Sequence, residues 1–130
     1  MDAAQALSDL TEISSQIEAA VVLDADGSAL ASTLDEQRAS EFTQVVQELL
    51  AAVRRASGSD SGELAQAEIA TADGSVFLVR DEQRTIAATT GPEPTVGLVF
   101  YDLKSCLRSF AQEKPKPRTR KKKAEDDGAA

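Results

Sequence analysis

The sequence predicts an α+β fold with the element order α-β-β-α-β-β-β-α. The first observation behind this prediction is a pair of Asp-Gly dipeptides, Asp26-Gly27 and Asp73-Gly74, each flanked by short runs of residues that favour strands. Such a pair predicts a hairpin with a type I′ turn, which requires positive φ at both central residues. The second observation is residues 34–56, a long stretch without Gly or Pro that predicts a helix. The chain is therefore organised as hairpin, helix, hairpin.

Residues 3–16 form the first predicted helix. Apolar side chains recur here at spacings of three and four, as expected for one face of an amphipathic helix: Leu7, Leu10, Ile13 and Ile17. The next segment, residues 19–23, is almost wholly apolar and predicts a strand at the centre of a sheet. Residues 28–32 return as its weaker partner strand.

The central helix at residues 34–56 is rich in Ala, Leu, Gln, Glu and Arg, which are good helix formers. Its apolar side chains cover roughly 160° when placed at ~100° per residue, wider than the ~100° stripe that one sheet face requires. They are Ala39, Phe42, Val45, Val46, Leu49, Leu50, Val53 and Ala56. This excess predicts a surface for self-association, although burial of a broad stripe within one domain explains it equally well.

Three strands are predicted after a polar segment at residues 57–62, which ends the central helix. The first, at residues 64–71, alternates apolar and polar side chains as a half-buried or edge strand does, with Ala65, Ala67 and Ile69 opposite Gln66 and Glu68. The second and third strands span residues 75–80 and 84–90.

Gly91-Pro92-Glu93-Pro94 ends the sheet and precedes a terminal helix at residues 95–112. Its apolar residues again recur at helical spacing: Val96, Val99, Leu103, Leu107 and Phe110. We expect Tyr101 to be a packing residue and Cys106 a small buried apolar one, because no His is present to activate the thiol.

The composition leaves few ways to build an active site. The 130 residues include no His, no Trp and one Cys, and they contain no phosphate-binding loop. Asp24-Ala25-Asp26 is similar to the start of a calcium loop, but Ala29 and Asp35 stand where that loop needs Gly and Glu. We therefore predict a binding module and not an enzyme, with no catalytic residue, no cofactor and no metal.

The net charge of −8 divides sharply along the chain. From Lys114 onward there are seven basic and three acidic residues, a net +4, whereas residues 1–113 carry seven basic and nineteen acidic residues, a net −12. We expect one domain at residues 1–113 and a disordered tail at residues 114–130. The basic residues of this tail are Lys114, Lys116, Arg118, Arg120, Lys121, Lys122 and Lys123.

The tail has several possible roles. It could be a solubilising terminus, a weak electrostatic contact for anionic lipid, or a contact for nucleic acid or an acidic partner. The acidic body argues against nucleic-acid binding by the folded domain. No basic residue precedes Arg38 and no apolar run approaches the ~20 residues of a membrane span, so we expect a cytoplasmic protein.

Together with the order of elements, three segments resemble the Roadblock family, which includes dynein light chains. They are Val21-Val22-Leu23-Asp24-Ala25-Asp26-Gly27, Ala72-Asp73-Gly74 and Gly97-Leu98-Val99-Phe100-Tyr101-Asp102-Leu103. The resemblance extends over about residues 3–112. It implies a profilin-like sandwich, in which a five-stranded antiparallel sheet carries the central helix on one face and the two terminal helices on the other.

The resemblance also implies a homodimer that joins through residues 64–71 and the 42–53 face of the central helix. The expected interface residues are Phe42, Val45, Val46, Leu49, Val53, Ala65, Ala67 and Ile69. The implied function is regulation or scaffolding of a Ras-like small GTPase in trans, by binding its switch region. A structural adaptor that binds its partner independently of nucleotide is the alternative.

An arginine finger is a further mechanism open to such a regulator, because an Arg supplied in trans can stabilise charge on a transferring phosphoryl group. The chain offers Arg38, Arg54, Arg55, Arg80 and Arg84. We expect each of them to be an ordinary solvated arginine.

Overall fold

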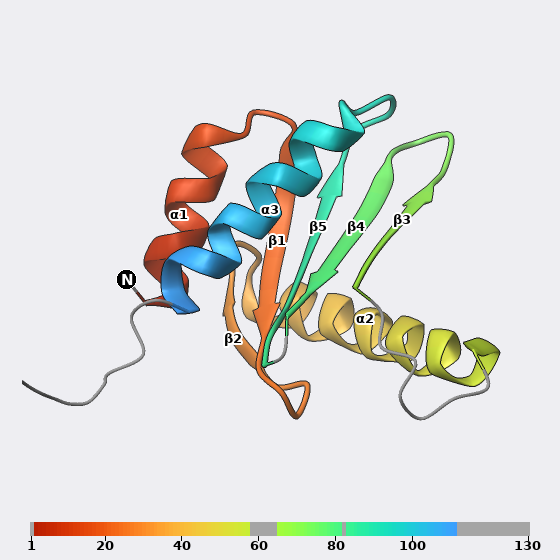
Figure 1. Ribbon diagram of the computed structural model, residues 1–130. Coiled ribbons are helices and arrows are strands. Elements are labelled where there is room, and N and C mark those ends of the chain that lie inside the picture. The colour runs from red at the N-terminus through yellow and green to blue at the C-terminus, as the bar shows by residue number, and fades with distance from the viewer. Residues whose placement is uncertain (1, 58–64, 82, 112–130) are drawn as a thin grey trace, which may run out of the picture.

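The computed structural model describes residues 2–57, 65–81 and 83–111 (Figure 1). Within them the chain forms the elements α1 (Ala3–Ile13), β1 (Ile17–Leu23), β2 (Ala29–Ser32), α2 (Glu36–Ser57), β3 (Gln66–Ala70), β4 (Ser75–Arg80), β5 (Thr85–Thr90) and α3 (Val96–Ala111). The predicted order of elements is therefore confirmed. Among the described residues no helix is both long enough and apolar enough to cross a membrane.

All five strands pair antiparallel in one sheet with the order β2-β1-β5-β4-β3. β5 lies at the centre, and β2 and β3 are the two edges (Figure 1). The pairing of β1 with β5 joins the first hairpin to the last three strands, with Val21 opposite Ala87 and Val22 opposite Ile86. The sheet therefore unites segments from the two ends of the domain.

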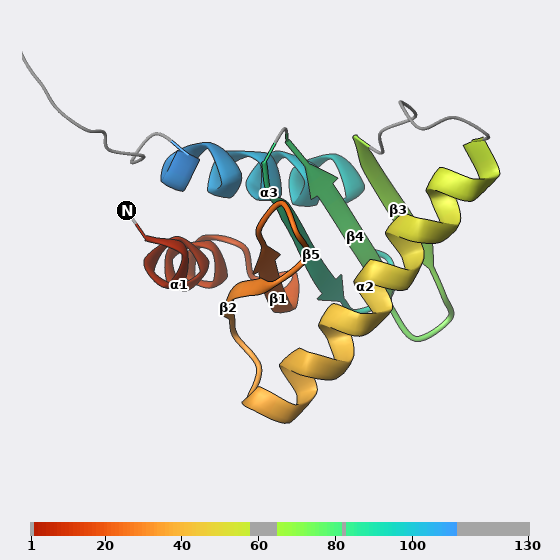
Figure 2. The same ribbon diagram turned by 90° about the horizontal axis from the view of Figure 1, so that it is seen from below.

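The helices cover both faces of the sheet, as predicted (Figure 2). Successive residues of a strand point to opposite faces, so Ala20 and Val22 face α1 and α3, whereas Val21 and Leu23 face α2. The fold is the profilin-like sandwich that the resemblance to the Roadblock family implied.

The core beneath α1 and α3 is the larger of the two. It includes Leu7 and Leu10 from α1 and Leu103 from α3, all at most 3% exposed. Phe100 is partly buried and packs against this core, where its ring meets that of Phe77 edge to face, with 5.0 Å between centroids and 76° between planes. Such a contact adds about 0.5–1.5 kcal/mol beyond the area that it buries.

The core beneath α2 is smaller. Val46 is fully buried against β1, β4 and β5, while four other apolar side chains that pack here are only partly buried: Phe42, Leu49, Leu50 and Ala67. Contacts within the chain therefore bury only part of the broad apolar stripe of α2.

The first helix ends three residues earlier than predicted, at Ile13. Ser14 has an extended backbone and its N–H donates to the Leu10 carbonyl at 2.8 Å, which closes the helix. Ile17 consequently belongs to β1 and is buried, whereas Ile13 is 74% exposed. The prediction ran too far because Ile17 of β1 continues the three-and-four spacing of the apolar residues of α1.

The remaining bounds agree with the prediction to within two residues, and those of β4 agree fully. α2 begins after Asp35, whose carboxylate accepts from the Arg38 N–H at 2.9 Å as an N-cap does. β3 is shorter than predicted at both ends, β5 starts one residue later, and α3 starts at Val96. Residues 58–62 of the predicted loop, Gln112 and the tail lie outside the described residues.

The prediction of type I′ turns is wrong at both Asp-Gly pairs. At the first, only Gly27 has positive φ, at 92°. Its N–H donates to the Asp24 carbonyl at 3.1 Å, and the Asp24 N–H donates to the Ser28 carbonyl at 2.9 Å, so the loop is one residue longer than a type I′ hairpin. A turn followed by a single left-handed Gly is the usual three-residue solution.

At the second pair the central residues are Ala72 and Asp73, because Thr71 and Gly74 bond to each other at 2.8 Å and 3.4 Å. Gly74 does not have positive φ. It is required for a different reason: a Cβ there would lie 2.2 Å from the Thr90 carbonyl oxygen. The glycine permits a close approach of two backbones.

We predict that Gly74→Ala lowers the free energy of unfolding by about 2 kcal/mol or more, because backbone atoms cannot move aside as a side chain can. Gly97→Ala is the matched control, since a Cβ at this exposed position of α3 meets nothing within 4 Å. It should stabilise the protein by about 0.5 kcal/mol through helix propensity and a less flexible unfolded chain. Urea unfolding of both variants tests this, and equal effects would contradict it.

Candidate functional site

Large apolar side chains reach solvent on two opposite faces of the molecule. Val45 and Ile69 lie on the α2 side, and Leu30 lies on the edge strand β2. A second group occupies the helices of the other face, at Ile13, Val96, Leu98 and Tyr101. Among the described residues these two groups mark the candidate binding surfaces.

The first candidate, called the α2–β3 surface below, contains the apolar residues expected in a dimer interface. Val45 is 47% exposed and Ile69 39% exposed, Ala65 is exposed, and the partly buried members are Phe42, Leu49, Val53 and Ala67. The structure thus brings residues of α2 and β3 to one side of the sheet. Val46 is the exception, because it is fully buried by its own sheet and has no side-chain surface left for a partner.

β3 adds backbone chemistry to this surface. It pairs with β4 alone and forms an edge of the sheet, so its second row of N–H and C=O groups has no strand partner in the described part of the chain. Unpaired edges favour addition of another strand. The combination of an open edge and exposed apolar side chains fits an interface between two sheets better than a small-molecule site.

The β1–β2 loop uses its carboxylates internally. Asp24 Oδ1 accepts from the N–H groups of Asp26 and Ser28 at 3.0 Å and 3.1 Å, and Asp26 Oδ1 accepts from the Ser28 N–H at 2.9 Å. Hydrogen bonds with Asp24 and then with Ser28 lower the pKa of Asp26. These contacts support the hairpin interpretation over the calcium loop.

No group of three or more His, Cys, Asp or Glu side chains is placed to hold a metal ion, as far as the described residues extend. The five candidate arginines are spread over several elements. Arg38 and Arg55 are exposed on α2, and Arg84 is half-buried just before β5. Arg54 and Arg80 line a cavity of about 190 Å³ beside the β1–β2 loop. The Nε of Arg80 is buried there without a hydrogen-bond partner.

Cys106 is buried between α1 and α3, as predicted, and is 6% exposed. Its thiol donates to the Ala6 carbonyl with 3.5 Å between Sγ and O. Burial, with a smaller contribution from the negative charge of Asp9, raises the pKa of the Cys106 thiol to about 11. A thiol that stays protonated at neutral pH is a poor nucleophile.

Sequence reasoning missed the second exposed group. Tyr101 was expected to pack, yet it is 63% exposed, and Ile13 was assigned to a buried stripe. The basic residues of the tail, from Lys114 onward, lie outside the described residues.

Comparison with known proteins agrees with this architecture. A family model for the Roadblock/LC7 domain matches residues 3–90. A Roadblock/LC7 domain from Streptomyces avermitilis superposes with a TM-score of 0.76 at 20% identity, covering 87% of this chain and 98% of that one. Among curated protein sequences, none matches this one.

Two further solved structures are MglB proteins. An MglB with a tetrameric arrangement gives a TM-score of 0.70 at 14% identity, covering 85% of each chain. The gliding protein MglB of Thermus thermophilus gives a TM-score of 0.68 at 13% identity, covering 85% of this chain and 86% of that one. At these identities the likeness establishes the fold.

We predict that the thiol of Cys106 makes stability depend on pH between about 9 and about 11. Below pH 9 the thiol is protonated in both the folded and the unfolded state and contributes no pH dependence. Above it the unfolded chain releases the proton at the ordinary pKa of 9.0, while the folded chain holds it up to about 11, so stability falls.

Urea unfolding over this range of pH, on the wild type and on Cys106→Ala, measures the effect. The difference in free energy of unfolding between the two should be constant up to pH 9 and decline from there to pH 11. A difference that stays constant throughout would show that the folded thiol titrates normally.

Proposed function

Because the chain belongs to the Roadblock/LC7 domain family, we propose that it is a non-catalytic, dimeric regulator or scaffold of a Ras-like small GTPase and binds the switch region of that GTPase. The observation that carries the proposal is the α2–β3 surface, where an unpaired edge strand and an incompletely buried helix face lie together. The tetrameric arrangement of one MglB neighbour supports self-association within this fold.

In the proposed dimer, β3 of each protomer pairs with β3 of its partner, and the two α2 helices pack through Phe42, Val45, Leu49 and Val53. Such an arrangement satisfies the open backbone edge and buries the excess of the α2 stripe at the same time. Val46 continues to hold α2 on its own sheet. The wide apolar arc of α2 is then shared between the core and the dimer interface.

A regulator without catalytic groups acts by differential binding. It must hold the switch loops of the GTPase in one of their two arrangements, so its affinities for the GTP and GDP forms must differ. A partner that binds both forms equally shifts no equilibrium, however tightly it binds. Nucleotide dependence therefore separates the regulator from an adaptor that only joins larger components.

We predict that Val45→Lys weakens the homodimer about a hundredfold, because a lysine would be desolvated at the centre of the proposed interface. Leu30→Lys is a matched control: Leu30 is 46% exposed and Val45 47%, but Leu30 lies on the opposite edge strand. Analytical ultracentrifugation should give monomers for Val45→Lys and dimers for Leu30→Lys. Dissociation by Leu30→Lys alone would place the interface at β2.

We also predict that purified protein captures a small GTPase from the native lysate in a nucleotide-dependent way. The lysate is divided between a non-hydrolysable GTP analogue and GDP, and mass spectrometry identifies the bound proteins. A GTPase enriched under one nucleotide supports the regulator. Partners captured equally under both conditions, or the absence of a GTPase, would favour the adaptor, with the basic tail as the next segment to test.

A further inference from the structure

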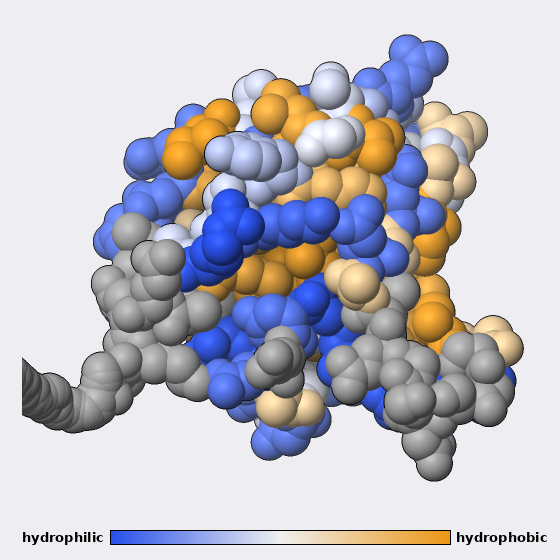
Figure 3. All heavy atoms as spheres, in the orientation of Figure 1, coloured by the Kyte–Doolittle hydropathy of each residue, from blue (hydrophilic) through white to orange (hydrophobic). Residues whose placement is uncertain are grey.

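The second exposed group of apolar side chains lies along a groove between α1 and α3, on the face of the sheet opposite to α2. Figure 3 shows hydrophobic side chains reaching the surface over these helices. The groove has a volume of about 360 Å³, and its lining residues are Ala6, Asp9, Leu10 and Ile13 of α1 with Tyr101, Asp102, Ser105, Cys106 and Ser109 of α3. We call this feature the α1–α3 groove.

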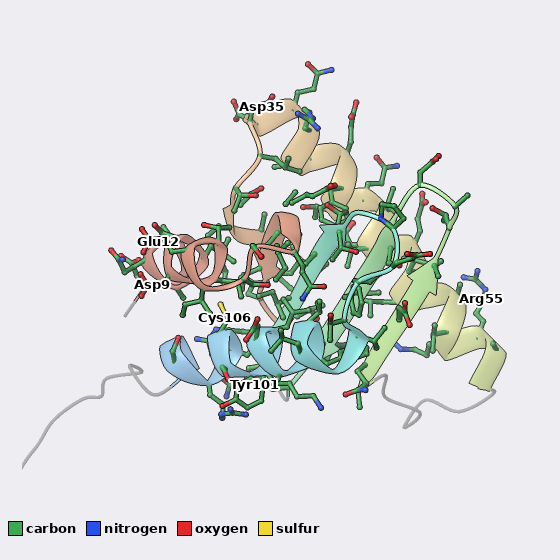
Figure 4. All side chains as sticks on the ribbon, turned by 90° about the horizontal axis from the view of Figure 1, so that it is seen from above. Asp9, Glu12, Asp35, Arg55, Tyr101 and Cys106 are labelled. Carbon is green, nitrogen blue, oxygen red and sulfur yellow. The ribbon has the colours of Figure 1, made fainter. Side chains whose placement is uncertain are left out.

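The lining residues have the spacing of two helix faces laid side by side. On α1 they recur at three and four residues from Ala6 to Ile13, which is roughly 10 Å at 1.5 Å per residue. Ile13 and Tyr101 are both exposed and line the groove. Cys106 lies between the two helices (Figure 4). A trough between two helices matches the ridge of a third helix.

One polar group in this groove lacks a partner. Asp102 is only 9% exposed and lines the groove, yet no hydrogen bond or ion pair reaches its carboxylate from the described residues. Neither of its oxygens is among the fully buried polar atoms without a partner, so water still reaches them and a cation on a partner can replace that water. The groove therefore has a place for a positive charge among apolar contacts.

The other charged side chain that lines the groove is also negative. α1 carries two acidic residues, Asp9 and Glu12 (Figure 4), of which Asp9 lines the groove. The first 37 residues of the chain contain no Lys or Arg. Like charges across an interface are unfavourable. A second copy of this chain would place acidic α1 against acidic α1, so the groove does not suit self-association.

We propose that the α1–α3 groove binds an amphipathic helix of another protein, whose apolar stripe contains a Lys or Arg that pairs with Asp102. The aliphatic part of the partner helix lies against Leu10, Ile13 and Tyr101, and its cation enters between Asp9 and Asp102. The tail of this chain does not fit the description, because residues 114–123 contain no apolar side chain other than proline. The groove and the α2–β3 surface lie on opposite faces of the sheet, so both can be occupied at once.

The test uses the full chain and two synthetic helical peptides with the same stripe of leucines. One peptide carries Arg within the stripe and its twin carries Glu there. In fluorescence anisotropy at physiological salt we expect the Arg peptide to bind, and the Glu peptide to bind about tenfold more weakly or not at all. A factor of about ten corresponds to the loss of one hydrogen bond between charged groups.

Three variants locate the binding. Asp102→Asn should weaken the Arg peptide about tenfold and remove the preference between the peptides. Ile13→Ser, at a position 74% exposed, should weaken both peptides, and Leu30→Ser, at a position 46% exposed on β2, is the control that should weaken neither. Bound Arg peptide should also slow alkylation of Cys106, the only cysteine in the chain.

Asp102→Asn gives a second readout that a structural carboxylate would not give. If Asp102 is kept for a partner and not for the fold, neutralising it should leave the urea midpoint of the free protein nearly unchanged while it weakens the Arg peptide. A fall in the midpoint would show that Asp102 stabilises the fold and would overturn the assignment.

Other results would also overturn the proposal. Three results would show that no helix with a positive charge binds in the groove: equal affinity for the two peptides, no binding of either, or loss of binding in Leu30→Ser. Faster alkylation of Cys106 after replacement of Lys121, Lys122 and Lys123 by Glu would identify the tail as the occupant. Slower alkylation with rising concentration of the Val45→Lys variant would identify a second copy.

Discussion

The antiparallel pairing of β1 with β5 is the interaction on which the rest of the structure depends. It joins the N-terminal hairpin to the three strands that follow α2 and makes one sheet out of two separate ribbons. Both cores need that width, because each draws side chains from β1, β4 and β5. The pairing is distant in sequence, so its chain-entropy cost must be met before either helix layer can pack. α1, α2 and α3 are therefore stable only as layers on the completed sheet.

The composition of β5 shows how this central strand serves two cores. Ala87 and Ala88 point to opposite faces, and on neighbouring β4 they stand opposite Leu78 and Phe77. A small residue beside a large one lets each helix approach the sheet without leaving a void. Alanine is a weak strand former, so the packing of β4 against β5, more than local propensity, favours the strand here.

Periodicity along the chain predicted the order of elements, because it reports which side chains repeat on one face. The placement of helices on both faces of the sheet was implied by the resemblance to the Roadblock family. Periodicity failed where two elements continue the same spacing: Ile17 completes the stripe of α1 but belongs to β1. It also could not show that Tyr101 and Ile13 stay exposed. An apolar residue contributes to the same sequence pattern whether it packs within its own chain or against another molecule. Likewise Gly74 is fixed by the carbonyl of Thr90, a contact that no local turn rule contains.

The two exposed apolar surfaces differ in their unsatisfied polar groups, and this difference carries more information than the hydrophobic area. On the α2–β3 surface the unsatisfied groups are the regularly spaced N–H and C=O of an edge strand, which only another strand can match over its length. In the α1–α3 groove the polar group without a protein partner is the single charge of Asp102, with which a cationic side chain can pair. Apolar exposure indicates that a surface has a partner, whereas the polar atoms left within it specify the chemistry of that partner. On this argument the proposed homodimer uses one face of the sheet, and the proposed helix with a positive charge uses the other.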